Sequence, residues 1–155
     1  MDIEQTIRDY LPSIIHLSLA TSVNDQPWTT EVHFAYDDDL NLYFRSLSSR
    51  RHSQEIDRNP HVSGSIIRQH QIDEYPFGVY FEGKAEQMAD ENDRMQAFTA
   101  ISKRFGLGRE ILDEAMQPSG HQFYRITVSK YYVFGKLDGD KGQKYELDWS
   151  TDHLS

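Results

Sequence analysis

The chain has 155 residues, with 25 acidic against 16 basic side chains and a formal net charge of −9 at pH 7. Its length predicts a single domain over residues 1–155, and its acidic charge argues against nucleic acid or an anionic membrane surface as a partner. The absence of cysteine excludes disulfides and thiolate sites. No run approaches the roughly 20 apolar residues of a membrane span, and the N-terminus lacks a signal-peptide pattern, so a soluble cytoplasmic protein is expected.

The first third of the chain predicts a short helix followed by three strands. Residues 2–11 carry the apolar spacing of a helix, and residues 14–21 form a short apolar run typical of a core strand. A turn signal then leads into an aromatic and β-branched strand over 28–36. An acidic turn at 37–39 precedes an alternating strand over 40–46, and together these strands indicate an antiparallel meander.

The rest of the chain adds three strands and more helix. Strands are expected over 61–68, 77–88 and 122–135, and in the second of these Gly78 and Gly83 indicate a bulge or a close backbone approach. Asp90 is the expected N-cap of a helix over 91–105. One or two further helical turns are expected over residues 109–116. Residues 136–155 are expected to form a polar C-terminal tail with three possible docking residues, Tyr145, Leu147 and Trp149. Six mostly antiparallel strands with inserted helices favour a small β-barrel with accessory helices.

The segment Leu40–Pro60 is the clearest candidate binding element. It joins the end of a strand to a helix expected to begin at Ser53 and to close at Asn59-Pro60. A helix N-terminus and arginine forks favour an anion, and phosphate in particular. The alternative is a solvated turn in which Ser49 or Ser53 only caps the helix. The side chains that could form the phosphate site are Arg45, Ser46, Ser49, Arg50, Arg51 and His52.

Common catalytic signatures are missing from the sequence. It contains no G-x-S-x-G, H-E-x-x-H, G-x-G-x-x-G or Walker motif, so a hydrolase elbow, a zinc site, a Rossmann site and a P-loop are disfavoured. No metal site is predicted. His33 and Tyr36 are weak acid–base candidates that strand packing explains equally well, and the catalytic residue therefore stays unassigned.

Several short stretches occur in an order that resembles a known family. They are L-A-T at 19–21, L-Y-F-R-S at 42–46, S-R-R-H at 49–52, N-P-H-V-S at 59–63 and E-G-K-A at 82–85. In this order and spacing the chain resembles the pyridoxamine 5′-phosphate oxidase-like family. The resemblance implies a mainly β fold with accessory α: a six-stranded antiparallel split β-barrel of Greek-key type, with short helices between strands.

The resemblance also implies a cofactor and a partner. In this family the segment matching Ser46–His52 holds the phosphate of FMN, with Ser46, Arg51 and His52 in the matching positions. The strand holding Thr30, Glu31, Val32 and His33 would line the isoalloxazine ring, and Phe134 matches a flavin-stacking tryptophan. Family members are usually homodimers with the flavin between the subunits. The expected function is therefore an FMN-dependent oxidoreductase of unknown substrate.

Departures from the family pattern limit this expectation. His52 replaces a lysine, which implies weaker and more pH-dependent phosphate binding unless Arg45 or Arg50 compensates. Gly78 replaces a polar strand residue, and the R-L-H-D-like substrate segment is absent, so vitamin B6 oxidation is not expected. Split barrels of this kind also bind the deazaflavin F420 or heme. Heme would need an axial ligand, and His70 or His121 would be that ligand. A non-catalytic flavin-binding or stress-related module is the remaining alternative.

Overall fold

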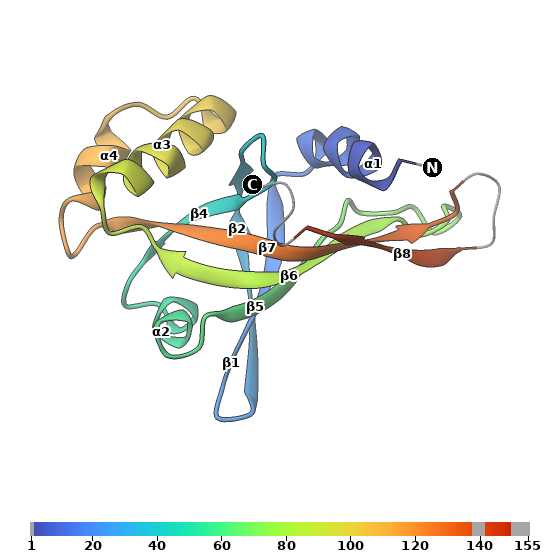
Figure 1. Cartoon of the computed structure of the whole chain (residues 1–155), viewed down its shortest axis with the longest axis horizontal. Helices are drawn as coiled ribbons and strands as arrows, with labels where there is room; N and C mark the ends of the chain where they lie inside the picture. The colour runs from blue at the N-terminus through green and yellow to red at the C-terminus, as the bar shows by residue number, and fades with distance from the viewer. Residues whose placement is uncertain (1, 138–141, 150–155) are drawn as a thin grey trace.

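The computed structural model describes residues 2–137 and 142–149, which form one strongly curled sheet flanked by helices (Figure 1). The strands are β1 (His16–Val23), β2 (Gln26–His33), β3 (Ala35–Tyr36), β4 (Leu42–Leu47), β5 (His61–Ile66), β6 (Gly78–Gln87), β7 (His121–Gly135) and β8 (Gln143–Asp148). The helices are α1 (Ile3–Tyr10), α2 (Arg51–Arg58), α3 (Glu91–Phe105) and α4 (Glu110–Ala115), with a short 3-10 turn, Leu11–Ser13, after α1.

The sheet order is β2-β1-β5-β6-β7-β4-β3, with β8 beside β7, and every pairing is antiparallel. The expected mainly β split barrel with inserted helices is confirmed. The count of six strands is corrected to eight within the described residues. One added strand arises because the expected strand over 28–36 breaks at Phe34, and the other is β8 in the C-terminal segment.

The predicted antiparallel meander of the first three strands is wrong. β1 pairs with β2 through the two-residue turn Asn24-Asp25, whose φ angles of 53° and 61° are ones that asparagine and aspartate tolerate. β3 and β4, however, lie at the opposite end of the sheet order from β2. The chain crosses between the two edges at Phe34, which is fully buried. The curled sheet therefore brings its first and last strands close together in space, as in a half-closed barrel.

Two hydrophobic clusters lie on the two faces of the sheet. The larger fills the barrel and includes Leu42, Phe44 and Tyr124, together with Ile7 of α1. The smaller packs α3 and α4 against the outer face and includes Tyr43 and Phe123. The alternation of Leu42 and Phe44 against Tyr43 is therefore as predicted, but both faces of β4 are buried.

A β-bulge changes the predicted faces of the long strand β7. The pairing register between β6 and β7 shifts between Glu82 and Gly83, so Ser129 has no opposite residue. A Cβ on Gly83 would lie 2.3 Å from the Thr127 carbonyl oxygen, which explains why glycine stands at the bulge as anticipated. Beyond the bulge the alternation reverses. Tyr131 therefore joins Val128 inside the barrel instead of the opposite face on which strict alternation placed it.

The C-terminal segment is more than a polar tail. β8 pairs with β7, and Leu147 packs against the barrel core. Trp149 is only 7% exposed, and its indole Nε1 donates a hydrogen bond of 2.7 Å to the Asp39 carbonyl oxygen. The docking role expected for Leu147 and Trp149 is therefore confirmed. Of the tail expected over residues 136–155, positions 138–141 and 150–155 lie outside the described residues.

The helices of the described residues are short or polar. None of them is long and apolar enough to cross a membrane.

Candidate functional site

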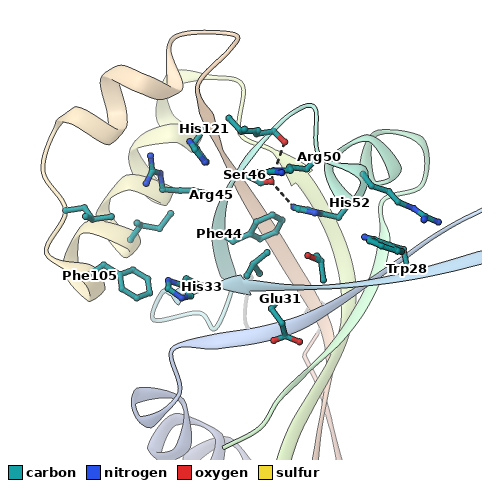
Figure 2. Close-up of a pocket in the computed structure, with 16 residues that line it drawn as sticks. Trp28, Glu31, His33, Phe44, Arg45, Ser46, Arg50, His52, Phe105 and His121 are labelled. Atoms are coloured by element: carbon teal, nitrogen blue, oxygen red, sulfur yellow. Dashed lines mark hydrogen bonds between the residues drawn. The ribbon is translucent and has the colours of Figure 1, made fainter.

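A cavity of about 910 Å³ lies where β2, β4 and the start of α2 meet the end of α3 (Figure 2). It brings together most of the residues singled out in the sequence. Those that line it are Thr30, Glu31, Val32, His33, Arg45, Ser46, Arg50, Arg51 and His52. Two segments that are far apart in the sequence, β2 and the β4–α2 junction, therefore form one site.

The helix of the Leu40–Pro60 segment begins earlier than predicted. α2 starts at Arg51 instead of Ser53, and its N-cap, Arg50, makes no side-chain capping hydrogen bond. Neither Ser49 nor Ser53 caps the helix, so the alternative of a simple serine cap is wrong. The first amides of a helix have no acceptor within the helix itself. Those of α2 remain available at its positive end, where an anion is stabilised.

A buried polar network holds His52 beneath this helix start. Its Nε2 lies 2.8 Å from Ser46 Oγ, which also accepts a 3.2 Å hydrogen bond from Ser53 Oγ. All three residues are buried. Burial, and secondly the charge of Arg50, lowers the pKa of His52 below its ordinary value. The imidazole is therefore neutral near pH 7 and acts as a hydrogen-bonding group, not as a substitute for the lysine charge.

The two arginines at the start of α2 differ in their partners. Arg51 Nε lies 2.8 Å from Glu55 Oε2, and its guanidinium stacks over the Trp28 ring at 4.2 Å. Thr21 Oγ1 donates a 2.7 Å hydrogen bond to the same carboxylate. The hydrogen bonds from Arg51 and then Thr21 lower the pKa of Glu55. Arg50 is exposed and has no ion-pair partner in the part of the chain that the structure describes, so its charge is free for a ligand.

The opposite end of the cavity is apolar and aromatic. Phe105, the last residue of α3, and Leu107, two residues beyond it, line this end, and the Phe105 ring stacks on His33 of β2 with centroids 6.0 Å apart. Phe44 forms the cavity floor, where its ring stacks on Tyr124 at 5.0 Å. A planar ring system could pack against this wall while an anionic group reached α2.

A third group of charged residues forms one edge of the cavity. Arg45 pairs with Glu114 of α4, and His121 Nδ1 lies 3.4 Å from the same carboxylate oxygen. His121 and Arg45 lie next to each other in Figure 2, both at the cavity edge. His70, the other expected heme ligand, lies outside this cavity, and its Nε2 accepts a 2.6 Å hydrogen bond from the Phe77 amide.

Two of the expected cofactor residues lie outside the cavity of this chain. Ser49 is exposed beside it, and Phe134 lies on β7 opposite Gly78, where its ring stacks on Tyr75 at 6.2 Å. Sequence reasoning also missed several lining residues, namely Trp28, Phe44, Leu47, Ile101, Phe105 and Leu107. The exposed aromatic at Trp28 was the one available signal. Ile101 and Phe105 fit the apolar spacing of an ordinary helix, so their sequence gave no sign that they line a cavity.

No group of three or more histidine, aspartate or glutamate side chains within residues 2–137 and 142–149 could hold a metal ion. The polar groups of the cavity are instead guanidinium and hydroxyl groups, imidazoles, the Glu31 carboxylate and helix amides around an aromatic wall. This chemistry fits an organic ligand that carries both a planar ring and an anionic group.

The fold and this cavity define a split-barrel protein with a site between a strand-to-helix junction and an aromatic wall. The chain belongs to the pyridoxamine 5′-phosphate oxidase family, whose model matches residues 3–135. A curated relative, the UPF0306 protein plu4501 of Photorhabdus laumondii, is 26% identical over 92 residues. That match covers 59% of this chain and 64% of the relative, so it spans less than two thirds of that protein.

Solved structures share the fold at low identity. The heme storage protein HutZ from Vibrio cholerae is 18% identical with a TM-score of 0.66, and the match covers 99% of this chain and 100% of HutZ. An FAD-binding protein from Mesorhizobium loti is 21% identical with a TM-score of 0.60, covering 83% of this chain and 89% of that one. The expected family and fold are therefore confirmed, and proteins of this fold bind flavin or heme.

Proposed function

We propose that this chain binds FMN in the cavity between β2 and α2 and acts as a flavin-dependent oxidoreductase. The observation that carries the proposal is the division of one cavity into a cationic helix start and an aromatic wall. Arg50 and the first amides of α2 form the cationic end, and Phe105 with His33 forms the other. FMN carries a phosphate and a planar ring system, and each end of the cavity suits one of them.

The phosphate would be held mainly by Arg50, Arg51 and the α2 amides. Arg50 contributes an unpaired charge, whereas the charge of Arg51 is shared with Glu55. Neutral His52 and Ser46 are bonded to each other, so they shape the floor of the site and add polar atoms without a full charge. Arg50 therefore compensates for the missing lysine more directly than His52 does.

The ring system would lie between the β2 backbone at Thr30–His33 and the wall formed by Phe105 and Leu107. Bound flavin supplies hydride and electron transfer, and the protein supplies binding, orientation and electrostatics around it. The apolar wall would exclude water from the ring.

Titration of the purified chain with FMN and with riboflavin, followed by flavin fluorescence, tests the phosphate site. We expect FMN to bind about tenfold or more tightly than riboflavin, because a charge-assisted phosphate contact contributes about 1.4 kcal/mol or more. Arg50→Ala should weaken FMN binding about tenfold and leave riboflavin binding unchanged. Arg109→Ala, at the exposed N-cap of α4 and outside the cavity, is the matched control. Equal affinity for both ligands, or no flavin binding, would contradict the proposal.

Heme is a second candidate because of one specific feature. His121 stands at the cavity edge with its Nδ1 beside Glu114, and its Nε2 has no hydrogen-bond partner among the described residues. A carboxylate beside one ring nitrogen is a common way of fixing the other nitrogen for a metal. A Soret band after heme addition that His121→Ala shifts and His70→Ala leaves unchanged would favour heme. A flavin envelope near 450 nm alone would favour FMN.

We also propose that the working unit is a homodimer with the cofactor between subunits. Phe134 lies outside the cavity of its own chain, so a stacking role for it requires a second copy. Light scattering of the FMN-loaded protein should give the mass of two chains, and a single-chain mass at micromolar concentration would contradict this arrangement.

A further inference from the structure

A second hollow lies beside the cationic end of the proposed cofactor cavity. It has a volume of about 310 Å³ and lies between α2 and the β1–β2 turn, with Asn24, Gln26, Gln54 and Arg58 on its walls. Arg51 lines both hollows. The candidate phosphate site therefore has a second hollow on the other side of Arg51.

The same two regular elements, β2 and α2, contribute walls to both hollows. Gln26, Trp28 and Thr30 alternate along β2 and so share one face of that strand. Gln26 lines the second hollow, and Trp28 and Thr30 line the first. On the helix side, Gln54 and Arg58 are four residues apart and therefore share one side of α2, and the N-cap Arg50 lies four residues before Gln54. A single extended ligand could contact both hollows along these two walls.

The charges of the second hollow favour an anionic ligand. Arg58 is exposed and has no ion-pair partner among the described residues. Glu55, the one acidic side chain of the hollow, accepts from both Arg51 and Thr21, so its charge is already engaged. Arg50, Arg51 and Arg58 therefore outnumber it along α2, in a chain whose formal net charge is −9.

A flat stacking surface stands at the junction of the two hollows. The Trp28 side chain is 39% exposed although it is a large aromatic, and the Arg51 guanidinium lies over its ring at 4.2 Å. Guanidinium and indole planes both stack on aromatic bases. The neighbouring amide side chains, Gln26 and Gln54, can donate to and accept from a base or a ribose.

We propose that the second hollow binds the adenylyl half of FAD, so that the two hollows together hold the dinucleotide across Arg51. This inference rests on the proposed flavin site, because FMN and FAD share the ring system and the first phosphate. The second phosphate of FAD lies between Arg51 and Arg58, and the adenosine extends toward the β1–β2 turn. FMN fills only the first hollow and leaves Arg58 without a ligand.

Parallel titrations of the full chain with FMN and FAD at one salt concentration test this assignment. We expect FAD to bind about tenfold more tightly than FMN, because it adds one charge-assisted phosphate contact and one stacking contact. Arg58→Ala should weaken FAD binding about five- to tenfold and change FMN binding less than twofold. Arg58→Lys should restore part of the FAD preference, because lysine keeps the charge but loses the fork.

Arg109→Ala, an exposed arginine of another helix, is the control and should change neither affinity. Unchanged thermal melting of each variant shows that folding is intact. FMN binding without a preference for FAD, or an Arg58→Ala variant that weakens both ligands equally, overturns the adenylyl site alone. Failure of the chain to bind either flavin overturns both this inference and the flavin site on which it rests.

Discussion

His52 stands where the family resemblance implies a lysine, yet its imidazole is buried and bonded to Ser46. Burial of a titratable ring in a protein disfavours its charged form. Relative to lysine, His52 therefore carries no permanent charge at the start of α2. Its imidazole instead forms a hydrogen bond with Ser46 beneath the helix. The cation that this end still offers is Arg50, which has no ion-pair partner among the described residues.

The lowered pKa of His52 predicts a pH-dependent contribution to stability. As the pH falls below about 6.5, the unfolded chain binds a proton before the folded chain does. The free energy of unfolding should therefore decrease below that pH, until the folded ring also becomes protonated. We expect His52→Gln, which keeps a hydrogen-bonding group, to show a smaller loss of stability between pH 7.5 and pH 5.5 than the wild type.

Urea unfolding at the two pH values measures this difference. His16→Gln, at an exposed position on β1, is the control and should keep the wild-type difference. A His52→Gln variant whose stability falls with pH as steeply as that of the wild type would show that the ring does not carry this pH dependence.

The sequence singled out the residues of the β4–α2 junction that line the cavity, but not their partners. With a helix expected from Ser53, Arg51 lay in the loop and had no predicted partner. Because α2 begins at Arg51, Glu55 lies one helical turn beyond it and pairs with it at 2.8 Å. A helix start is hard to place from sequence, and a shift of two residues here gave Arg51 an ion-pair partner. Arg50 has none among the described residues.

At the scale of elements, helix and strand types were predictable, and their edges and faces were not. The helix α3 and its N-cap Asp90 followed directly from local sequence, and the Asp90 side chain accepts from the Asp93 amide at 2.8 Å. β7 has nearly the predicted length, but the bulge opposite Gly83 turns Tyr131 toward the inside of the barrel. Bulges depend on the partner strand, so alternation along one strand cannot reveal them.

β8 was missed because its residues are mostly polar and its pairing partner is distant in sequence. Trp149, directly after β8, packs edge-on against Tyr131 with ring centroids 6.4 Å apart, and its indole donates a hydrogen bond to the backbone of the β3–β4 turn. The Tyr131 hydroxyl donates to the Leu40 carbonyl oxygen at 2.6 Å beside it. The C-terminal segment therefore fastens this turn to the barrel.

Removing this fastening should lower stability without affecting the cofactor cavity. We expect Trp149→Ala to reduce the free energy of unfolding by about 3 kcal/mol, the usual cost of truncating a buried aromatic. Tyr145→Ala, a half-buried residue of the same strand, should cost about 1 kcal/mol or less. Urea denaturation measures both, and FMN affinity should stay unchanged in both. A Trp149→Ala variant as stable as the wild type would contradict the fastening role.

At the scale of the whole molecule, the curl of the sheet creates the cavity. β2 and β4 belong to opposite ends of the sheet order, and α3 (Glu91–Phe105) begins well after the end of β4 at Leu47. Periodicity along the sequence carries no information about such closure, and only the family resemblance joined Thr30–His33 to Ser46–His52. The α3 wall, absent from that resemblance, was therefore not predicted.

Phe134 gives the sharpest test of the proposed dimer, because it lies outside the cavity of its own chain. If Phe134 of the partner subunit completes each site, Arg50→Ala and Phe134→Ala homodimers both bind FMN weakly. In a mixed dimer, one site combines both substitutions and the other contains neither. We therefore expect co-refolded mixed dimers to bind about one FMN per dimer with wild-type affinity.

Differently tagged subunits allow the mixed dimer to be purified and titrated by flavin fluorescence. Half-of-sites recovery requires that the two residues act on one ligand from different chains, because substitutions acting within one chain would leave both sites of the mixed dimer impaired. If Phe134→Ala binds FMN like the wild type, Phe134 does not contact the cofactor. If the mixed dimer recovers no site, the cavity is completed within one chain, and the aromatic wall of Phe105 and His33 alone faces the ring.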